Sequence, residues 1–172
     1  MNNNLIITIG REYGTGGREI GQKLALRLGV PFYDRELITR AAKKTGFDEK
    51  LFEQLEKRAT NSFLYSLTMF GSVGLNGMSL TDQLYLAQSN IIREMAEDSS
   101  CVIVGRCADH VLRDFPNKFD FFIHGSIEDR VKRVQTCGDY VIEGKTPEAA
   151  LEKMDKQRST YYNYYTGKVW GK

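Results

Sequence analysis

The sequence predicts an α/β fold with a mainly parallel central sheet between layers of helices. Three short apolar runs, at 5–9, 101–106 and 118–125, have the β-branched and aromatic composition of buried strands. Apolar residues recur at helical spacing between them, and strands that alternate with helices are typical of a parallel sheet covered on both faces. The 172 residues fit a single domain, 1–172, with a core of ordinary size.

Glycines and polar caps place the remaining elements. A helix follows the first strand and ends at Gly29, and residues 30–33 predict a second, shorter strand. Ser126 with Asp129 forms a capping box for a helix to about 136, and Thr146 with Pro147 starts a last helix to about 164. Helices are also expected at about 35–44, 48–58 and 80–95, with an irregular insertion at 59–79.

Composition argues against several classes of protein. The net charge of +2 gives no field that would favour nucleic acid. No apolar run approaches the roughly 20 residues of a membrane span, and the first four residues lack the features of a signal peptide. Three cysteines without a CxxC pair fit a reducing compartment better than a disulfide scaffold or a zinc site. We therefore expect a soluble cytoplasmic protein that binds neither nucleic acid nor membranes.

The stretch IITIGREYGTGGREIG combines a strand, a glycine-rich turn and a helix start. Backbone N–H groups and the helix dipole make such a turn an anion site. Against the phosphate-loop pattern G-x-x-x-x-G-K-[ST], Arg11 takes the place of the first glycine, Gly17 that of the lysine and Arg18 that of the Ser or Thr. The candidate phosphate-binding residues are Gly10, Arg11, Glu12, Tyr13, Gly14, Thr15, Gly16, Gly17 and Arg18.

Two other interpretations of this stretch stay open. It fits a glycine-rich turn that binds nothing. It also fits half of a dinucleotide fingerprint, because Gly14 and Gly16 form G-x-G and Asp34 lies about 20 residues on, where an acid would bind ribose. The third glycine of that fingerprint is absent, since Glu19 occupies its position.

Three further motifs, FYDRELITRAA, VIVGRCADHVL and DKQRSTYYNYYTGKVWG, resemble the cytidylate kinase-like family of P-loop nucleoside monophosphate kinases. The similarity runs from Ile6 to Gly171, and the order of the motifs is more specific than any one of them. The resemblance implies a three-layer α/β/α P-loop kinase fold, ATP as phosphoryl donor, Mg²⁺, and CMP or dCMP as acceptor. The partners would then be small-molecule nucleotides.

The resemblance also assigns site residues, in an acceptor-binding segment of about 34–98 and a lid segment of about 130–165. Asp34 and Arg40 would bind the acceptor phosphate, unless Asp34 only caps a helix and Arg40 is a surface charge. Arg106 and Asp109 would hold the acceptor, although Cys107 stands where the family has aspartate. The lid would supply Lys156 and Arg158, joined by Arg130 and Arg133, unless these cations form only intrahelical pairs.

The missing loop lysine raises the question of which cation replaces it. We hypothesise that Arg18 binds the donor phosphates and is catalytic together with Lys156 and Arg158, with Arg11 as a second source of charge. No metal ligand can be assigned, because Thr15 is poorly placed to replace the missing hydroxyl. The resemblance implies a further strand and helix after the lid, so either a segment beyond Lys172 supplies them or the sheet lacks an edge strand. In the second case the open edge would invite a homodimer or another partner. Three functions remain: an active kinase, a non-catalytic nucleotide-binding module, or a dinucleotide oxidoreductase.

Overall fold

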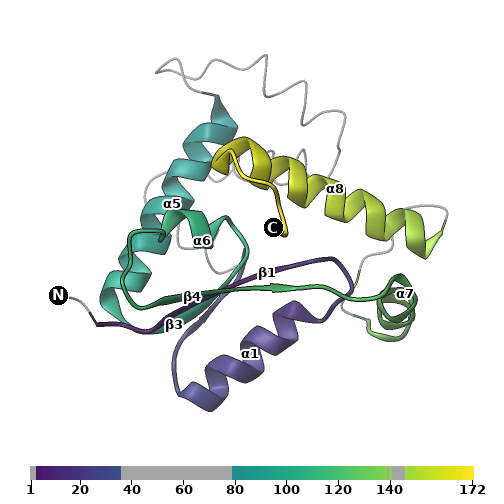
Figure 1. Ribbon diagram of the computed structural model, residues 1–172, viewed down its shortest axis with the longest axis horizontal. Coiled ribbons are helices and arrows are strands. Elements are labelled where there is room, and N and C mark those ends of the chain that lie inside the picture. Colours follow the sequence, from purple (N-terminus) through teal and green to yellow (C-terminus); the bar gives the residue numbers. More distant parts are fainter. Residues whose placement is uncertain (1–2, 36–78, 139, 141–145) are drawn as a thin grey trace.

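The computed structural model describes residues 3–35, 79–138, 140 and 146–172. Its sheet has four parallel strands in the order β2-β3-β1-β4. Helix α1 lies on one face of this sheet, and α5, α6 and α8 lie on the other (Figure 1). The strands are β1 (Ile6–Arg11), β2 (Phe32–Tyr33), β3 (Cys101–Val104) and β4 (Lys118–Ile123), and the helices are α1 (Gly17–Leu28), α5 (Leu80–Asp98), α6 (Ala108–Val111), α7 (Ile127–Thr136) and α8 (Pro147–Thr166). The α/β fold with a parallel sheet is confirmed.

The two faces of the sheet carry separate apolar clusters. Ile7 and Ile9 of β1 pack with Ala25 of α1, and Ile6 joins a cluster on the opposite face with Ile92 of α5. This alternation along β1 follows from the period of two in a strand. Both clusters contain residues of β3, which explains why β1 and β3 are read in the sequence as continuous apolar runs.

The predicted caps are confirmed. Gly29 ends α1 in the left-handed region with φ of 65°. The Ser126 hydroxyl accepts from the Asp129 N–H at 3.1 Å at the start of α7, and Thr146 does the same for Ala149 at 3.2 Å ahead of Pro147 in α8. Local sequence signals therefore fix where α1, α7 and α8 begin or end.

All four strands differ from the prediction at a boundary: β2 covers residues 32–33 rather than 30–33, and β4 ends at 123 rather than at 125. β1 continues to Arg11, because Gly10 and Arg11 stay paired with β4. β3 ends at Val104 rather than at 106, because Gly105, Arg106 and Cys107 have φ of 82°, 57° and 55°. Three consecutive left-handed residues cannot continue a strand, and they lead instead into the short helix α6, which the sequence did not predict. Most of the predicted elements at 35–44, 48–58 and 59–79 lie outside the described residues.

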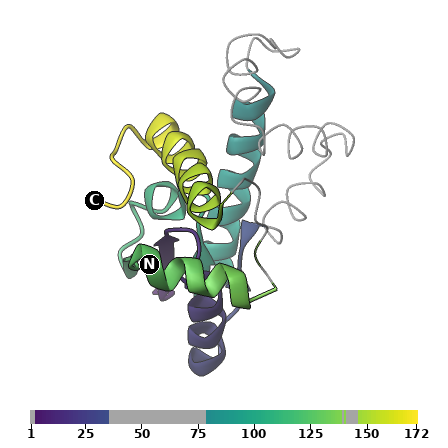
Figure 2. The ribbon, with the colours of Figure 1, turned by 90° about the vertical axis from the view of Figure 1, so that its right-hand side faces the viewer.

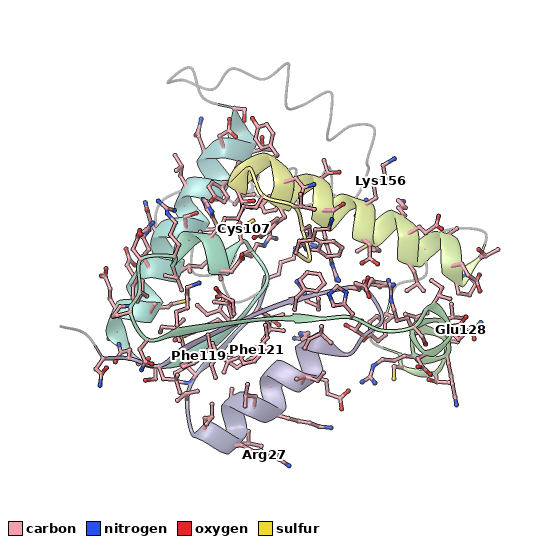
Figure 3. All side chains as sticks on the ribbon, in the orientation of Figure 1. Arg27, Cys107, Phe119, Phe121, Glu128 and Lys156 are labelled. Carbon is pink, nitrogen blue, oxygen red and sulfur yellow. The ribbon has the colours of Figure 1, made fainter. Side chains whose placement is uncertain are left out.

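β4 is one of the two outer strands of the described sheet, at the opposite edge from β2. Its Phe119 and Phe121 are 53% and 52% exposed on the side of α1 (Figure 3). On the other face Phe122 contacts Trp170, with ring centroids 5.0 Å apart, in the segment that follows α8. None of the helices in the described part of the chain is long and apolar enough to cross a membrane. The homodimer stays a prediction.

Candidate active site

A cavity of about 1020 Å³ opens at the carboxyl ends of β1 and β3, beneath α8. This is the edge of a parallel sheet at which ligands bind in open α/β folds. Its volume lies at the upper end of the roughly 300–1,000 Å³ typical of ligand pockets, so there is room for more than one small molecule. Among the described residues, four arginines line it: Arg11, Arg35, Arg106 and Arg158.

The glycine-rich loop, residues 12–16, connects β1 to α1 beside this cavity. Gly14 and Gly16 have φ of 82° and 74°, and Gly16 is the N-cap of α1. A Cβ on Gly14 would lie 3.0 Å from the Arg130 carbonyl oxygen, so the loop is also packed too tightly for a side chain there. The Thr15 hydroxyl donates to the Glu12 carbonyl oxygen at 2.9 Å and is therefore used within the loop.

Arg130 ties this loop to α8. The side chain is buried, and its Nε donates to the Tyr13 carbonyl oxygen at 2.8 Å. Its guanidinium forms an ion pair with Asp155 of α8 and lies 3.5 Å from Glu12. Asp155 in turn accepts from the Tyr13 N–H at 2.7 Å. Arg130, predicted as a lid cation, is in this arrangement held by two carboxylates.

Burial raises the pKa of Asp155, although the Tyr13 N–H and the Arg130 guanidinium act in the opposite direction. Desolvation thus outweighs the partners of this carboxylate. The Asp155 side chain is only 17% exposed, and Arg130 stabilises its ionised form at this position.

Arg158 of α8 reaches into the cavity. Its Nη1 donates to the Arg11 carbonyl oxygen at 3.1 Å, and its Cζ lies 5.1 Å from the centre of the Tyr13 ring. Burial lowers the pKa of Arg158, and Asp155 opposes that shift. Lys156, its predicted partner, lies at the rim of the cavity and is exposed, with its side chain on the outer side of α8 (Figure 3).

Arg133 of α7 lies against the start of α1. It forms an ion pair with Glu19, and a Cβ placed on Gly16 would be 2.7 Å from its Cζ. A hydrogen bond with Tyr140 raises the pKa of Arg133. A guanidinium therefore occupies the space beside Gly16, at the helix terminus where the sequence predicts an anion. Figure 2 shows α7 and the neighbouring end of α8 in front of the sheet.

Arg18 forms an ion pair with Asp34 rather than lining the cavity. Its Nε lies 2.7 Å from the carboxylate of Asp34, which follows β2; the Arg18 side chain is 53% exposed and that of Asp34 only 7%. Neither residue lines the cavity. The structure thus joins the predicted donor cation to a predicted acceptor residue. Arg40 lies outside the described residues.

Arg106 and Asp109 both line the cavity. The Arg106 guanidinium lies 5.7 Å from the centre of the Tyr161 ring, and Asp109 accepts from the Tyr162 hydroxyl at 2.5 Å. Burial raises the pKa of Tyr161 to about 12. The Tyr162 pKa is raised by burial first and by its bond to Asp109 second, so both phenols stay protonated near neutral pH.

Sequence reasoning missed several lining residues. Arg35 directly follows Asp34 and was not singled out. In the tyrosine run of α8, Tyr165 stacks on Tyr85 with ring centroids 4.0 Å apart, whereas Tyr161 and Tyr162 line the cavity. Trp170 lies within a quoted motif, yet only the folded chain shows that it reaches the cavity wall.

The comparisons with known proteins decide the family. The model of the cytidylate kinase-like family matches residues 6–172. The chain belongs to the cytidylate kinase-like family. An uncharacterized protein from Eubacterium ventriosum has a similar structure, with a TM-score of 0.71, 32% identity, and coverage of 98% of this chain and 82% of that one. A search of the curated proteins gives no match.

Two solved kinases share the fold of this cytidylate kinase-like chain. The shikimate kinase from Bacteroides thetaiotaomicron has a TM-score of 0.55 and 16% identity over 92% of this chain and 82% of its own. The gluconokinase from Sinorhizobium meliloti has a TM-score of 0.53 and 15% identity over 91% and 76%. The chain therefore has the fold of the P-loop kinases, as the sequence motifs imply.

Proposed function

We propose that this chain is an ATP-dependent kinase that transfers the γ-phosphoryl group to a nucleoside monophosphate, CMP or dCMP. The observation that carries the proposal is the convergence of Arg11, Arg35, Arg106 and Arg158 on one cavity beside a glycine-rich loop. Phosphoryl transfer depends mainly on positioning and on positive charge around the phosphoryl oxygens. Membership of a kinase-like family supports the same reaction class.

The donor phosphates fit the loop and the start of α1. Gly14 and Gly16 leave room for close approach to the backbone, and the N-terminus of a helix of 12 residues favours an anion. The Arg133 guanidinium beside Gly16 is already in position to contact such a phosphate. On binding, it would exchange its carboxylate partner Glu19 for phosphate oxygens.

The side chains that the structure describes would hold magnesium only indirectly, through the phosphates of a bound nucleotide. The ion supplies charge neutralisation across phosphate oxygens in such reactions. Within the described residues no group of three or more His, Cys, Asp or Glu side chains could ligate a metal. The Thr15 hydroxyl is engaged with Glu12. Water and phosphate oxygens are therefore the ligands that we expect for the ion.

The acceptor side of the cavity combines charge with aromatic surface. Arg106 would bind the acceptor phosphate, and Asp109 would accept a hydrogen bond from an acceptor hydroxyl or amino group. Tyr161, Phe122 and Trp170 line the same cavity and offer flat faces for a base. This lining favours a nucleotide over the acceptors that shikimate kinase and gluconokinase are named for.

A non-catalytic nucleotide-binding module is the second candidate. It is favoured by the missing loop lysine and by Arg133, which fills the space beside Gly16 while paired with Glu19. A dinucleotide oxidoreductase draws no support from the family. We further propose that the protein works in the cytoplasm with nucleotides as its partners, without nucleic acid or membrane.

The proposal is tested by measuring ADP release with ATP, Mg²⁺ and one acceptor at a time. The acceptors are CMP, dCMP, UMP, AMP, shikimate and gluconate. We expect turnover with CMP or dCMP, lost in Arg106→Ala. Binding of ATP without turnover on any acceptor would favour the non-catalytic module, and turnover on shikimate or gluconate alone would refute the nucleotide acceptor.

A further inference from the structure

Gly17 is the residue that stands in the place of the loop lysine, and the structure shows why it has no side chain. A Cβ on Gly17 would lie 2.7 Å from the Cβ and 2.8 Å from the Cγ of Arg11. Gly17 is the first residue of α1 and is not among the glycines with positive φ. Space rather than backbone conformation therefore requires glycine here. The aliphatic part of Arg11 fills the volume that a lysine side chain would need.

The other end of the Arg11 side chain lies against Gly105, just after β3. A Cβ on Gly105 would be 2.5 Å from the Nη1 of Arg11. The side chain thus runs from beneath Gly17 at the loop to the carboxyl end of β3. Its guanidinium lies between the predicted donor loop and the Gly105-Arg106 turn, which lines the acceptor side of the cavity. With the donor at the loop and the acceptor at this turn, as proposed above, the transferred phosphoryl group would pass this guanidinium.

The Arg11 guanidinium differs from the two arginines at the start of α1 and on α7 that carboxylates neutralise. Arg18 is paired with Asp34 and Arg133 with Glu19. Within the described part of the chain, no carboxylate forms an ion pair with the Arg11 guanidinium.

Burial lowers the pKa of Arg11 to about 9. The nearby charges of Arg158, Arg106 and Arg35 contribute smaller effects in the same direction, and Asp34 acts in the opposite direction. This pKa remains above neutral pH, so the group is charged. A cation held among like charges is stabilised by an arriving anion, and the energy gained is available to bind the phosphoryl group.

We propose that Arg11 is the relocated loop cation: it replaces the lysine of the usual phosphate loop and binds the phosphoryl group during transfer. The inference rests on the proposed kinase function and adds the identity of the cation and the reason for Gly17. Arg11 forms no covalent bond; its N–H groups donate to phosphoryl oxygens while the acceptor oxygen displaces ADP. Arg18, the cation expected from sequence order, has no such role.

The test has two parts: one variant removes the positive charge of Arg11, and another restores a cation as lysine at position 17. Arg11→Met keeps the aliphatic volume and removes the charge, and we expect kcat to fall by roughly 100-fold with a smaller change in the KM for ATP. Arg27→Met on the exposed side of α1 is the matched control and should keep both values (Figure 3). The pair Arg11→Gly with Gly17→Lys should recover at least roughly tenfold in kcat over Arg11→Gly alone.

Binding of inorganic pyrophosphate, measured by calorimetry, separates this inference from the proposed function. We expect Arg11→Met to weaken it at least roughly tenfold and Arg27→Met to leave it unchanged. Wild-type protein that phosphorylates no acceptor would refute the kinase, while pyrophosphate binding would still decide the role of Arg11. The inference would be overturned if the pyrophosphate affinity of Arg11→Met stayed within twofold of wild type. It would also be overturned if the wild-type protein were an active kinase and the pair Arg11→Gly with Gly17→Lys, folded as judged by its melting temperature, recovered no kcat.

Discussion

Replacing Arg130 with methionine removes the tie between the glycine-rich loop, α7 and α8. Methionine retains most of the aliphatic volume, so the change removes mainly charge and hydrogen bonds. The loss includes the bond from Nε to the Tyr13 carbonyl oxygen at 2.8 Å and the ion pair with Asp155. The Arg130 side chain is 9% exposed and that of Asp155 17%, so water replaces little of what is lost.

The expected cost follows from that burial. Breaking a buried ion pair by removing one partner costs about 3–5 kcal/mol, and because Asp155 keeps some contact with water we expect about 3 kcal/mol at neutral pH. That is a large share of the about 5–15 kcal/mol by which a domain is stable. The control is Arg113→Met, whose 3.8 Å pair with Asp114 is exposed and should be worth less than about 0.5 kcal/mol.

The loss should also depend on pH. Burial raises the folded-state pKa of Asp155 above its ordinary value of 3.8, so the folded protein holds a proton more readily than the unfolded chain. Stability therefore falls as pH rises through that folded-state pKa. Arg130 lowers this pKa, and removing it widens the difference. The destabilisation should accordingly be largest near neutral pH and shrink as the pH falls toward the unfolded value.

Urea unfolding followed by circular dichroism, at about pH 7.5 and about pH 5, measures both effects. We expect Arg130→Met to lose about 3 kcal/mol at the higher pH and clearly less at the lower. A loss below about 1 kcal/mol, or one that is the same at both pH values, would show that Arg130 is not what stabilises the ionised Asp155.

Three further predictions concern single positions. Gly14→Ala should lose at least roughly 2 kcal/mol of unfolding free energy and Gly29→Ala only roughly 1 kcal/mol. The reason is that a Cβ at Gly14 meets the Arg130 carbonyl oxygen at 3.0 Å, whereas one at Gly29 meets nothing within 4 Å. Equal losses of the two variants in thermal melts would contradict this. At Arg106, with φ of 57°, the glycine variant should be roughly 1 kcal/mol more stable than the alanine variant, although neither should phosphorylate an acceptor; alanine as the more stable of the two would refute the backbone argument. The Cys107 thiol is buried, with a pKa raised to about 12, and should not react with Ellman's reagent in the native protein, whereas Cys137 should. Rapid labelling of Cys107 without denaturant would contradict this and show that α6 opens readily.

The parts of the fold that local signals specify were predictable. The caps at Ser126 and Thr146 and the end of α1 at Gly29 depend on residues within a few positions, and the structure confirms them. The end of β3 was not predictable in this way. Gly105-Arg106-Cys107 adopts left-handed angles that Arg and Cys rarely take, so only the surrounding structure can impose them.

The candidate site shows the same division. The glycine-rich loop and Arg106 could be located from motif order, because the family resemblance covers nearly the whole chain. The carboxylate that pairs with each cation could not be predicted in this way. Arg18 pairs with Asp34, 16 positions on, and Arg130 with Asp155, 25 positions on, and no spacing rule links residues so far apart. The Arg11 side chain occupies the space beside Gly17, and this contact likewise appears only when strand and helix are packed together.

Binding of a bisubstrate analogue tests most directly whether one cavity holds both donor and acceptor. The compound is adenosine joined to cytidine through five phosphates, and the assay is isothermal titration calorimetry with wild-type protein. We expect one molecule per chain, bound more tightly than either ATP or CMP alone and displaced by each of them. An analogue that binds no more tightly than ATP, or that CMP fails to displace, would contradict a shared site at the ends of β1 and β3.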